Sequence, residues 1–584
     1  MTNVAEDLKD WQDLTLDQFD GGLVLEGDTE LLEVNELLEA KNMVYKDEKF
    51  KRDTGYKKLY EAVVGDPRRH VTYRKRDGAV VEFLITNASA FRSDSGHWRP
   101  VLRGTAPTTV NGNEAAGQTV ITVVNAAGFG SGNRIGIELD DGTWHMTTVN
   151  GAPAGNDITI TVALPSQASN GNDVIRMVSL SGDTSHHVTA VPVPWGDYVV
   201  FTNGVDVLKY YDPATDTVAD VAGVPTNMVC QTLALFDNSI VVAATIESGV
   251  NLPYRVRWCA KGDLANWTTL ESGFTDLLDT ESHIKQLLKL GPFLMIYREK
   301  SISRMAISGA LFRRFDFDTA VNDVGVFSQY SVIDLVDYHI VWANDDIYRY
   351  AGGSAVESLE SPIYQALFGP DGEMGEDTRS KAFAVYLRKT KEALFIYQPT
   401  GAGGCTSAAR YNLRKDNWTT RVFADNLTGF GSRVSNDALD WEDLVGDWVD
   451  QTNPWSSYST SGNVEQQSFG TTSDRVMIYD YLSGLDNTSG IICSIQTKDF
   501  SHPSYLTRHD YLDVFAAGGT ITVEYSTDKG ASWEMLGTIS ASTVSTRYRL
   551  FKQFTARHLR FRLTSSSSMT LAALHMRFKY EFEH

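Results

Sequence analysis

Short strand-like runs alternate with turns along most of the chain. Within residues 181–485, a unit recurs about every 40–55 residues: an apolar strand, a turn rich in Gly, Asn, Asp or Lys, and a second strand. This is the length of a four-stranded propeller blade. The clearest units are 197–213, 238–267, 291–307, 337–353 and 392–421. The pattern predicts a mainly β chain with a β-propeller core, because blades repeated around an axis leave few sheet edges open.

The repeated pattern extends beyond these units. Segment 70–98 has the same form and predicts a first blade, and a weaker unit lies near 474–482, which gives about six or seven blades. Trp267 and Trp418 each follow a polar turn, in "DLANW" and "RKDNW", and each indole is expected to pack one blade against the next. We therefore expect a first blade at 61–103 and the remaining blades at 181–487.

Residues 104–180 interrupt the repeated pattern. They contain no lysine, and runs such as "GQTVITVV" alternate with period two before turns of Gly, Asn and Ser. This alternation predicts antiparallel strands, here a small inserted β-barrel or sandwich domain. Asp140, Asp141 and His145 suggest a metal site, but a hairpin turn at Asp141-Gly142 explains them without an ion, and we favour the turn.

Residues 488–584 form a last module of strand-like runs. In "LRFRL", Leu559, Phe561 and Leu563 alternate with two arginines, so apolar side chains face one way and cations the other. The arginines are Arg560 and Arg562. We expect a C-terminal β-sandwich of about 95 residues.

Charge changes sign near the N-terminus. The first 40 residues hold twelve acidic residues and one lysine, whereas residues 41–76 hold twelve lysines and arginines. Apolar positions at helical spacing predict one short amphipathic helix, capped by Asp28 or Thr29. These positions are Leu31, Leu32, Val34, Leu37 and Leu38. We expect residues 1–60 to be a charged N-terminal arm whose acidic and basic parts pair with each other, contact a neighbouring chain or are solvated.

Composition limits the class of protein. The 584 residues are 42% hydrophobic and 11% aromatic, which suffices for several packed cores, and no run of about 18 apolar residues is present to span a membrane. The start "MTNVAEDLKDWQDL" has no features of a secretory signal. The four cysteines form no CxxC pair, so we expect reduced, mostly buried thiols in a protein that folds in a cytoplasm. They are Cys230, Cys259, Cys405 and Cys493.

The formal net charge of −22 argues against a sequence-reading DNA-binding protein, which needs a basic surface. The same charge is compatible with a conduit for DNA, because an acidic wall repels phosphate groups. Solubility alone also explains the acidity.

One short motif suggests an enzyme. The stretch "EYSTDKGASWEML" contains S-x-D-x-G-x-S-W and is similar to the Asp-box turn of sialidase propellers. Its residues are Ser526, Asp528, Gly530, Ser532 and Trp533. The stretch lies between two strand-like runs, and Gly530 can supply the positive φ that such a turn needs. Because the turn lies outside the repeated units, we interpret it as a structural hairpin.

Two pairs of adjacent residues are further candidates for chemistry. His186 and His187 would point to opposite faces of a strand and could not easily share a metal ion. Asp345 and Asp346 lie in a turn and are expected to serve its geometry. No G-x-S-x-G, H-E-x-x-H or P-loop motif occurs. We therefore predict no catalytic, cofactor-binding or metal-binding residues, and we do not expect an enzyme.

The stretch "YRVRWCAKGDLANW" combines aromatic and basic residues that could stack on nucleic acid. Tyr254, Val256 and Trp258 alternate with Arg255 and Arg257, however, and this alternation favours a strand with one core face and one solvent or interface face. We expect core packing.

Several stretches, taken in order, resemble a known family. They are "KNMVYKDEKFKRDTGY", "YRVRWCAKGDLANW", "VGVFSQYSVIDLVDYHIVWANDDIYRYAGG", "IQTKDFSHPS" and "VEYSTDKGASW", with the inserted hairpin "IGIELDDGTWHMTTV". They look like parts of the tail hub or nozzle proteins of short-tailed bacteriophages, also called packaged-DNA stabilisation or head-completion proteins. The resemblance spans most of residues 40–584. Each motif is degenerate, so the order of the parts carries the resemblance.

The resemblance implies a structural virion protein of the phage tail, synthesised in the host cytoplasm. Six copies would form a homohexameric ring beneath the portal and adaptor rings. The ring would join them to the distal tail, with its fibres or needle, and extend the channel for double-stranded DNA. It would retain packaged DNA until ejection without reading its sequence. No motif marks the residues of a DNA gate, and no cofactor is implied.

Two other classes of function stay open. A glycan-active propeller enzyme, such as a sialidase or depolymerase, would need convergent arginines, a tyrosine nucleophile and an acidic partner, and no motif marks them. A receptor-binding tail protein is usually a trimer with fibrous repeats, and no heptad run is present here. The tail hub is therefore the favoured expectation.

Overall fold

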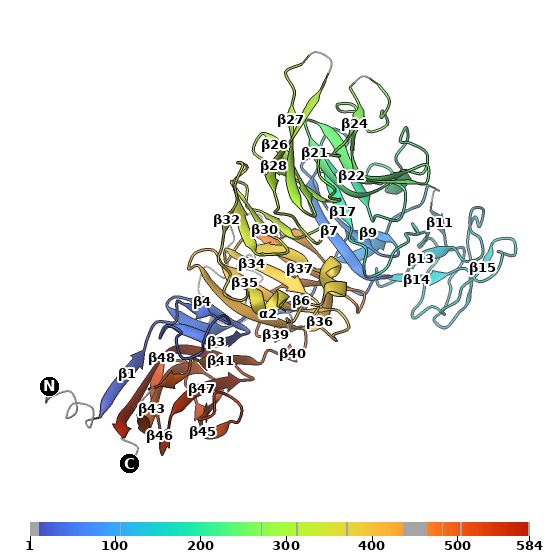
Figure 1. Ribbon diagram of the computed structural model, residues 1–584. Coiled ribbons are helices and arrows are strands. Elements are labelled where there is room, and N and C mark those ends of the chain that lie inside the picture. The colour runs from blue at the N-terminus through green and yellow to red at the C-terminus, as the bar shows by residue number, and fades with distance from the viewer. Residues whose placement is uncertain are drawn as a thin grey trace.

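The computed structural model of the chain is mainly β, as the sequence predicts (Figure 1). It describes residues 11–104, 107–269, 271–310, 313–369, 372–435, 464–481, 483–502 and 505–581. Within these ranges the helical elements are short, namely α2 (Tyr364–Phe368) and the 3-10 helix η1 (Glu376–Lys381). No helix among these residues is long and apolar enough to cross a membrane.

Four consecutive sheets, each of four antiparallel strands in sequence order, occupy residues 189–358. Their strands are β17 (Thr189–Val193), β18 (Tyr198–Thr202), β19 (Lys209–Asp212) and β20 (Thr217–Asp220); β21 (Val229–Phe236), β22 (Ser239–Glu247), β23 (Val250–Trp258) and β24 (Gly273–Asp276); β25 (Ile284–Leu290), β26 (Phe293–Arg298), β27 (Ser301–Ile307) and β28 (Phe315–Asn322); and β29 (Val332–Asp334), β30 (His339–Trp342), β31 (Ile347–Tyr350) and β32 (Glu357–Ser358). The first strand of each sheet contacts the first strand of the next. Trp267 is buried in a cluster shared by the first two sheets, as predicted.

Two more runs of four antiparallel strands flank these sheets. They are β7 (Pro67–Arg74), β8 (Val80–Thr86), β9 (Ala90–Asp94) and β10 (His97–Pro100), and β33 (Phe383–Leu387), β34 (Glu392–Tyr397), β35 (Cys405–Asn412) and β36 (Asn417–Ser435). β7 contacts β17, and β29 contacts β33. The long strand β36 also pairs in parallel with β7, where Gly431 lies opposite His70. This pair joins the last run to the first.

A ladder of strands continues from β36. It runs through β37 (Val464–Thr471), β38 (Arg475–Tyr479), β6 (Tyr56–Lys58), β39 (Leu485–Asp486) and β40 (Ser489–Gly490). Because β6 precedes β7 in the chain, this ladder ties a segment near the N-terminus to strands more than 400 residues later.

The segment between β10 and β17 has a hydrophobic core of its own. Its strands are β11 (Thr108–Thr109), β12 (Val120–Thr122), β13 (Arg134–Glu138), β14 (Trp144–Thr148), β15 (Asp157–Thr159) and β16 (Asp173–Arg176). β11, β16, β13 and β14 form one sheet, and β12 pairs with β15. Ile135 and Val174 from the sheet pack in one cluster with Ile121 and Ile158 from the pair.

Two sheets near the C-terminus contribute side chains to one hydrophobic cluster. One sheet contains β43 (Leu506–Gly518), β46 (Thr546–Ala556) and β48 (Met569–Glu581), and the other contains β41 (Cys493–Thr497), β42 (Phe500–Ser501), β44 (Thr520–Ser526), β45 (Glu534–Ser540) and β47 (His558–Ser565). Leu512 of the first and Val523 of the second lie in this cluster. Along β47, Phe561 is buried and Arg560 and Arg562 are half-buried, so the predicted alternation is confirmed.

The predicted N-terminal helix is wrong. Residues Glu36–Lys41 form strand β3, which pairs antiparallel with β41. Leu37 is fully buried, whereas Leu31 is 82% exposed, so the apolar positions do not share one buried stripe. A strand partner distant in sequence satisfies the backbone of β3, and this tertiary pairing overrides the local helical spacing.

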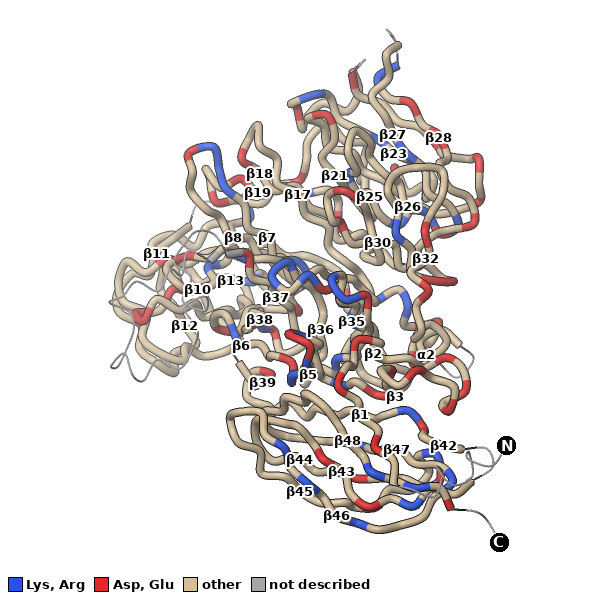
Figure 2. Tube along the Cα trace, turned by 90° about the vertical axis from the view of Figure 1, so that its left-hand side faces the viewer, with Lys and Arg blue, Asp and Glu red and all other residues tan. Residues whose placement is uncertain are grey.

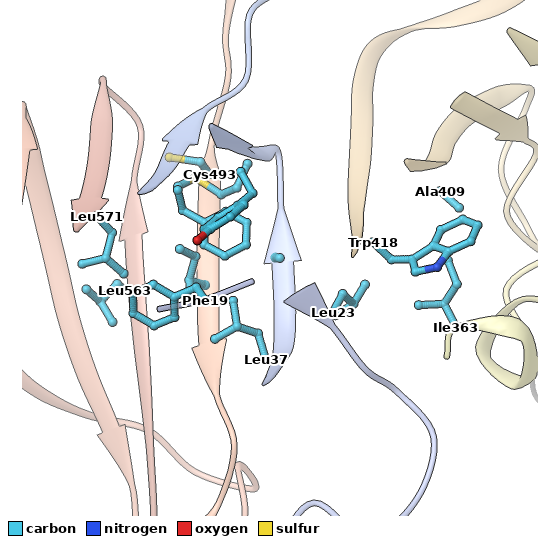
Figure 3. Close-up of a cluster of buried hydrophobic side chains, with 14 of the residues drawn as sticks. Phe19, Leu23, Leu37, Ile363, Ala409, Trp418, Cys493, Leu563 and Leu571 are labelled. Atoms are coloured by element: carbon cyan, nitrogen blue, oxygen red, sulfur yellow. The ribbon is translucent and has the colours of Figure 1, made fainter. Parts of the chain in front are cut away.

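The N-terminal segment is also not a free arm. β1 (Gln12–Leu16) and β5 (Lys49–Arg52) pair with β48, β4 (Met43–Lys46) pairs with β5, and β2 (Gly22–Leu23) pairs with β3. Figure 3 shows Phe19 and Leu37 beside Leu563 and Leu571 of the C-terminal sheets, with Leu23 lying toward Trp418 of β36. The segment therefore connects the C-terminal sheets to the rest of the chain.

Candidate functional site

The Asp-box stretch forms a hairpin whose polar groups are engaged within the turn. Asp528 accepts hydrogen bonds from the hydroxyl of Ser526 (2.7 Å) and the backbone N–H of Ser532 (2.8 Å). The hydroxyl of Ser526 in turn accepts one from the N–H of Gly530, whose φ is +90°. Hydrogen bonds from Ser532 and Ser526 lower the pKa of Asp528 to about 2. Trp533 lies under the guanidinium of Arg562 at 4.2 Å.

Asp140, Asp141 and His145 of the inserted segment each have different hydrogen-bond partners. Asp140 accepts hydrogen bonds from Ser169 and Asn172, and Asp141 accepts them from Thr143. His145 faces the carbonyl of Val162 at 2.9 Å. In the described parts of the chain, no group of three His, Cys, Asp or Glu side chains is arranged to hold a metal ion.

The members of the two adjacent pairs, His186 with His187 and Asp345 with Asp346, contact different groups. His186 faces Asp183 at 2.9 Å, whereas His187 faces the carbonyl of Ser380 at 3.0 Å. Asp345 accepts a hydrogen bond from Tyr348 (2.8 Å), and Asp346 accepts one from the N–H of Ile347 (2.7 Å). Neither pair is brought together for acid–base or metal chemistry. The four cysteines are buried and form no disulfide.

Strand β23 has the predicted core face. Val256 and Trp258 are buried. On the other face, Arg257 pairs with Glu247 (2.9 Å), Arg255 pairs with Asp276 (2.7 Å), and both guanidinium groups lie over the ring of Phe274. The arginines are therefore neutralised within the chain. Arg255 on this face also pairs with Glu247. Tyr254, on the face of Val256 and Trp258, lies edge-on to His283.

A groove of about 470 Å³ lies between β24 and β28, and the sequence did not reveal it. Its lining includes Trp258, Phe274, Phe315, Phe317, Arg313 and Arg314. The guanidinium of Arg314 is engaged by Asp237 (3.1 Å) and by backbone carbonyls, and that of Arg313 pairs with Asp316. The lining contains no tyrosine. The groove thus lacks the free convergent arginines and the nucleophile of a sialidase site.

A buried network of charges links the N-terminal segment to β35, β36 and β39. Arg410 and Arg421 both pair with Asp53, and Arg421 also pairs with Asp486. The hydroxyl of Tyr479 donates a hydrogen bond to Asp53 over 2.8 Å. All five side chains are almost fully buried. The sequence signal for this network is an arginine inside each of two apolar strand runs, "SAARYN" and "TTRVF".

The two carboxyl groups of this network respond differently to burial. Burial disfavours the charge of Asp53, but the charges of Arg410 and Arg421 outweigh it and lower the pKa of Asp53. Burial raises the pKa of Asp486 to about 6, against the opposing charge of Arg421. Asp486 is therefore the member of the network that titrates near neutral pH.

The raised pKa of Asp486 predicts a pH dependence of stability. An unfolded aspartate has a pKa of about 3.9, so the folded state binds this proton more tightly. The resulting stabilisation is complete below about pH 4 and is lost as the pH rises through about 6. Between pH 5 and 7, the wild type is expected to lose about 1 kcal/mol more unfolding free energy than Asp486→Asn. Urea unfolding at the two pH values measures this, with the exposed Asp323→Asn as control. Equal losses in all three proteins would contradict the prediction.

Comparison of the chain with protein-family models and with curated proteins finds no match.

Proposed function

We propose that the chain is a structural subunit of a phage tail hub, or nozzle. A six-fold ring of copies joins the portal and adaptor assembly to the distal tail, extends the DNA channel and retains packaged DNA until ejection. The action is steric and electrostatic, with no turnover. Each obligate contact between copies would bury about 2,000 Å² or more.

The order of parts along the chain is the observation that carries this proposal. A first run of four strands (67–100) is followed by a segment with its own core (108–176), then by five further runs of four strands (189–435) and a two-sheet module (493–581). The tail hub proteins that the sequence resembles have these parts in this order. A propeller of six blades, with an inserted β-domain and a C-terminal β-sandwich, is the corresponding fold.

Contacts between the sheets support the propeller. The first strands of successive runs contact one another from β7 through β17, β21, β25 and β29 to β33. The parallel pairing of β36 with β7 then brings the sixth run back to the first. This succession of contacts is what blades arranged around an axis require.

Aromatic and basic side chains pack together where the first run meets the last. The guanidinium of Arg69 in β7 lies 4.4 Å from the ring centre of Phe430 in β36 and 5.5 Å from that of Tyr330. Phe383 of β33 stacks on Phe430 at 5.5 Å, and His187 lies edge-on to Tyr330. In the proposed assembly, DNA passes along the axis shared by the copies.

The net charge supports a channel wall. Each copy contributes −22, so a ring repels phosphate groups and lets DNA slide without condensing on the protein.

A phage from which this gene is deleted tests the proposal. We expect heads that package DNA but lose it, so that the genome becomes sensitive to nuclease and plaques are absent. Supplying the chain in trans should restore both. Filled heads that keep their DNA without this chain would overturn the proposal.

A second assay separates the proposal from a glycan-active enzyme, for which the aromatic groove is the relevant feature. The purified chain is incubated with sialosides and with host polysaccharide, and released sugar is measured. Release that Arg314→Ala abolishes would favour the enzyme.

A further inference from the structure

Two turns that begin with the same sequence, Leu-Arg-Lys, lie side by side. Both connect neighbouring strands of the β33–β36 sheet, at the same end of these strands. The first follows β33 and the second follows β35, and the N–H of Leu413 donates to the carbonyl of Lys391 over 3.1 Å. We call them the basic turns. Their exposed cations are Arg388, Lys389, Lys391, Arg414 and Lys415. Figure 2 shows blue turns next to each other near β35 and β37.

Most of these cations lack a carboxylate partner. Among the described residues, Arg388 pairs with Glu465 at 2.8 Å, and the other four form no ion pair. Asp416, in the second turn, accepts a hydrogen bond from Tyr411 instead (2.6 Å). A set of unneutralised cations is unexpected for solubility alone in a chain whose net charge is −22, because the chain has ample carboxylates to pair them.

Each of the three lysines lies near a tyrosine ring. The ammonium of Lys389 lies 4.7 Å from the ring centre of Tyr481, that of Lys391 lies 5.8 Å from Tyr386, and that of Lys415 lies 6.0 Å from Tyr45. A ring face attracts a cation without neutralising its charge.

A complementary acidic surface lies on the neighbouring β29–β32 sheet. We call it the acidic rim; its members are Asp345, Glu357 and Glu360. All three are exposed and, in the part of the chain that the structure describes, none forms an ion pair. Arg349, the cross-strand neighbour of Glu357, lies over the ring of Tyr338 at 4.2 Å instead. The rim is therefore free to meet cations from outside the chain.

The two surfaces lie on neighbouring sheets, whose strands β29 and β33 contact each other. Figure 2 shows blue turns near β35 and β37 and a red segment beside β32. When a surface on one copy binds a different surface on the next, the contact is head-to-tail, and a closed ring results when the rotation closes.

We propose that the basic turns of one copy dock on the acidic rim of the next copy. The proposal rests on the ring assembly proposed above and assigns the surfaces that form it. Copies carrying −22 repel one another, so association needs local pairs of opposite charge to offset that repulsion and to fix the register.

Charge reversal on each surface tests the pairing. In the full-length chain, Lys389→Glu with Lys415→Glu, or Glu357→Lys with Glu360→Lys, is expected to weaken self-association at least about tenfold, measured by sedimentation velocity. Combining all four substitutions should restore most of the association, because each contact regains opposite charges. Lys300→Glu with Arg547→Glu is the matched control, since both are exposed and remote from the basic turns; it changes net charge equally and should have little effect.

The outcomes separate this inference from the proposed function. A wild type that stays monomeric, alone and with the adaptor complex, would contradict the ring itself. A wild-type ring that both reversed variants still form would overturn only the assigned surfaces, as would failure of the combined variant to recover. Binding of a DNA duplex that Lys389→Glu with Lys415→Glu abolishes, while the ring stays intact, would assign the basic turns to phosphate and overturn the inference.

Discussion

Replacing Arg421 with methionine is expected to lower the free energy of unfolding by about 3–5 kcal/mol, the cost of breaking a buried ion pair from one side. Arg421 pairs with Asp53 and Asp486 and donates a hydrogen bond to Asn42 (3.1 Å). Methionine keeps the apolar stem but leaves Asp486 buried without its cation. The loss should appear as a lower denaturant midpoint.

The matched control for this substitution is Arg547→Met, at an exposed arginine that forms no ion pair among the described residues. It should change the unfolding free energy by less than about 0.5 kcal/mol. The pH offers a second check. Without Arg421, the carboxyl of Asp486 should stay protonated to a higher pH, so the variant should be more destabilised at pH 8 than at pH 5. A cost below about 1 kcal/mol at pH 8 would mean that water enters the network and that it does not hold the segments together.

Replacing Gly431 with alanine is expected to cost about 3 kcal/mol, at the upper end of overpacking penalties. A Cβ atom at this position would lie 2.0 Å from the carbonyl oxygen of His70. That oxygen belongs to the backbone of β7, so it cannot move away without breaking the parallel pair that joins β36 to β7. We expect faster amide exchange along both strands, because their pairing is opened.

Gly353→Ala is the control for this prediction, since a Cβ there meets nothing within 4 Å. It should leave both the midpoint and the exchange pattern unchanged. If Gly431→Ala left the exchange of β7 and β36 as slow as in the wild type, the junction between the first and last runs would not depend on this close approach.

Local patterns in the sequence predicted which faces of many strands are buried. Phe561 faces the core while Arg560 and Arg562 do not, and Val256 and Trp258 are buried as their alternation indicates. Such patterns are reliable because successive side chains of a strand point to opposite faces whatever the partner strand is. The turn chemistry of the Asp-box was predictable for a similar reason, since the hydrogen bonds of Ser526 and Asp528 join residues within four positions of each other.

The helix predicted near the N-terminus was wrong because residues 36–41 pair as a strand with β41, which is distant in sequence. Leu37 is opposite Thr497, and Ala40 is opposite Ile495. Nothing within the segment itself identifies that partner. The aromatic groove could not be predicted from the sequence for the same reason, because Trp258, Phe274 and Phe317 come together from separate strands.

The sequence by itself determined that the chain is mainly β, where its turns lie and which faces of its strands are apolar, because these depend on neighbours a few positions apart. Only the tertiary structure decided that the charged N-terminus is built into the sheets, that Asp53 meets Arg410 across 357 positions and that two basic turns adjoin. Pairing over such separations is selected by the packing of the whole chain, so no local pattern carries it.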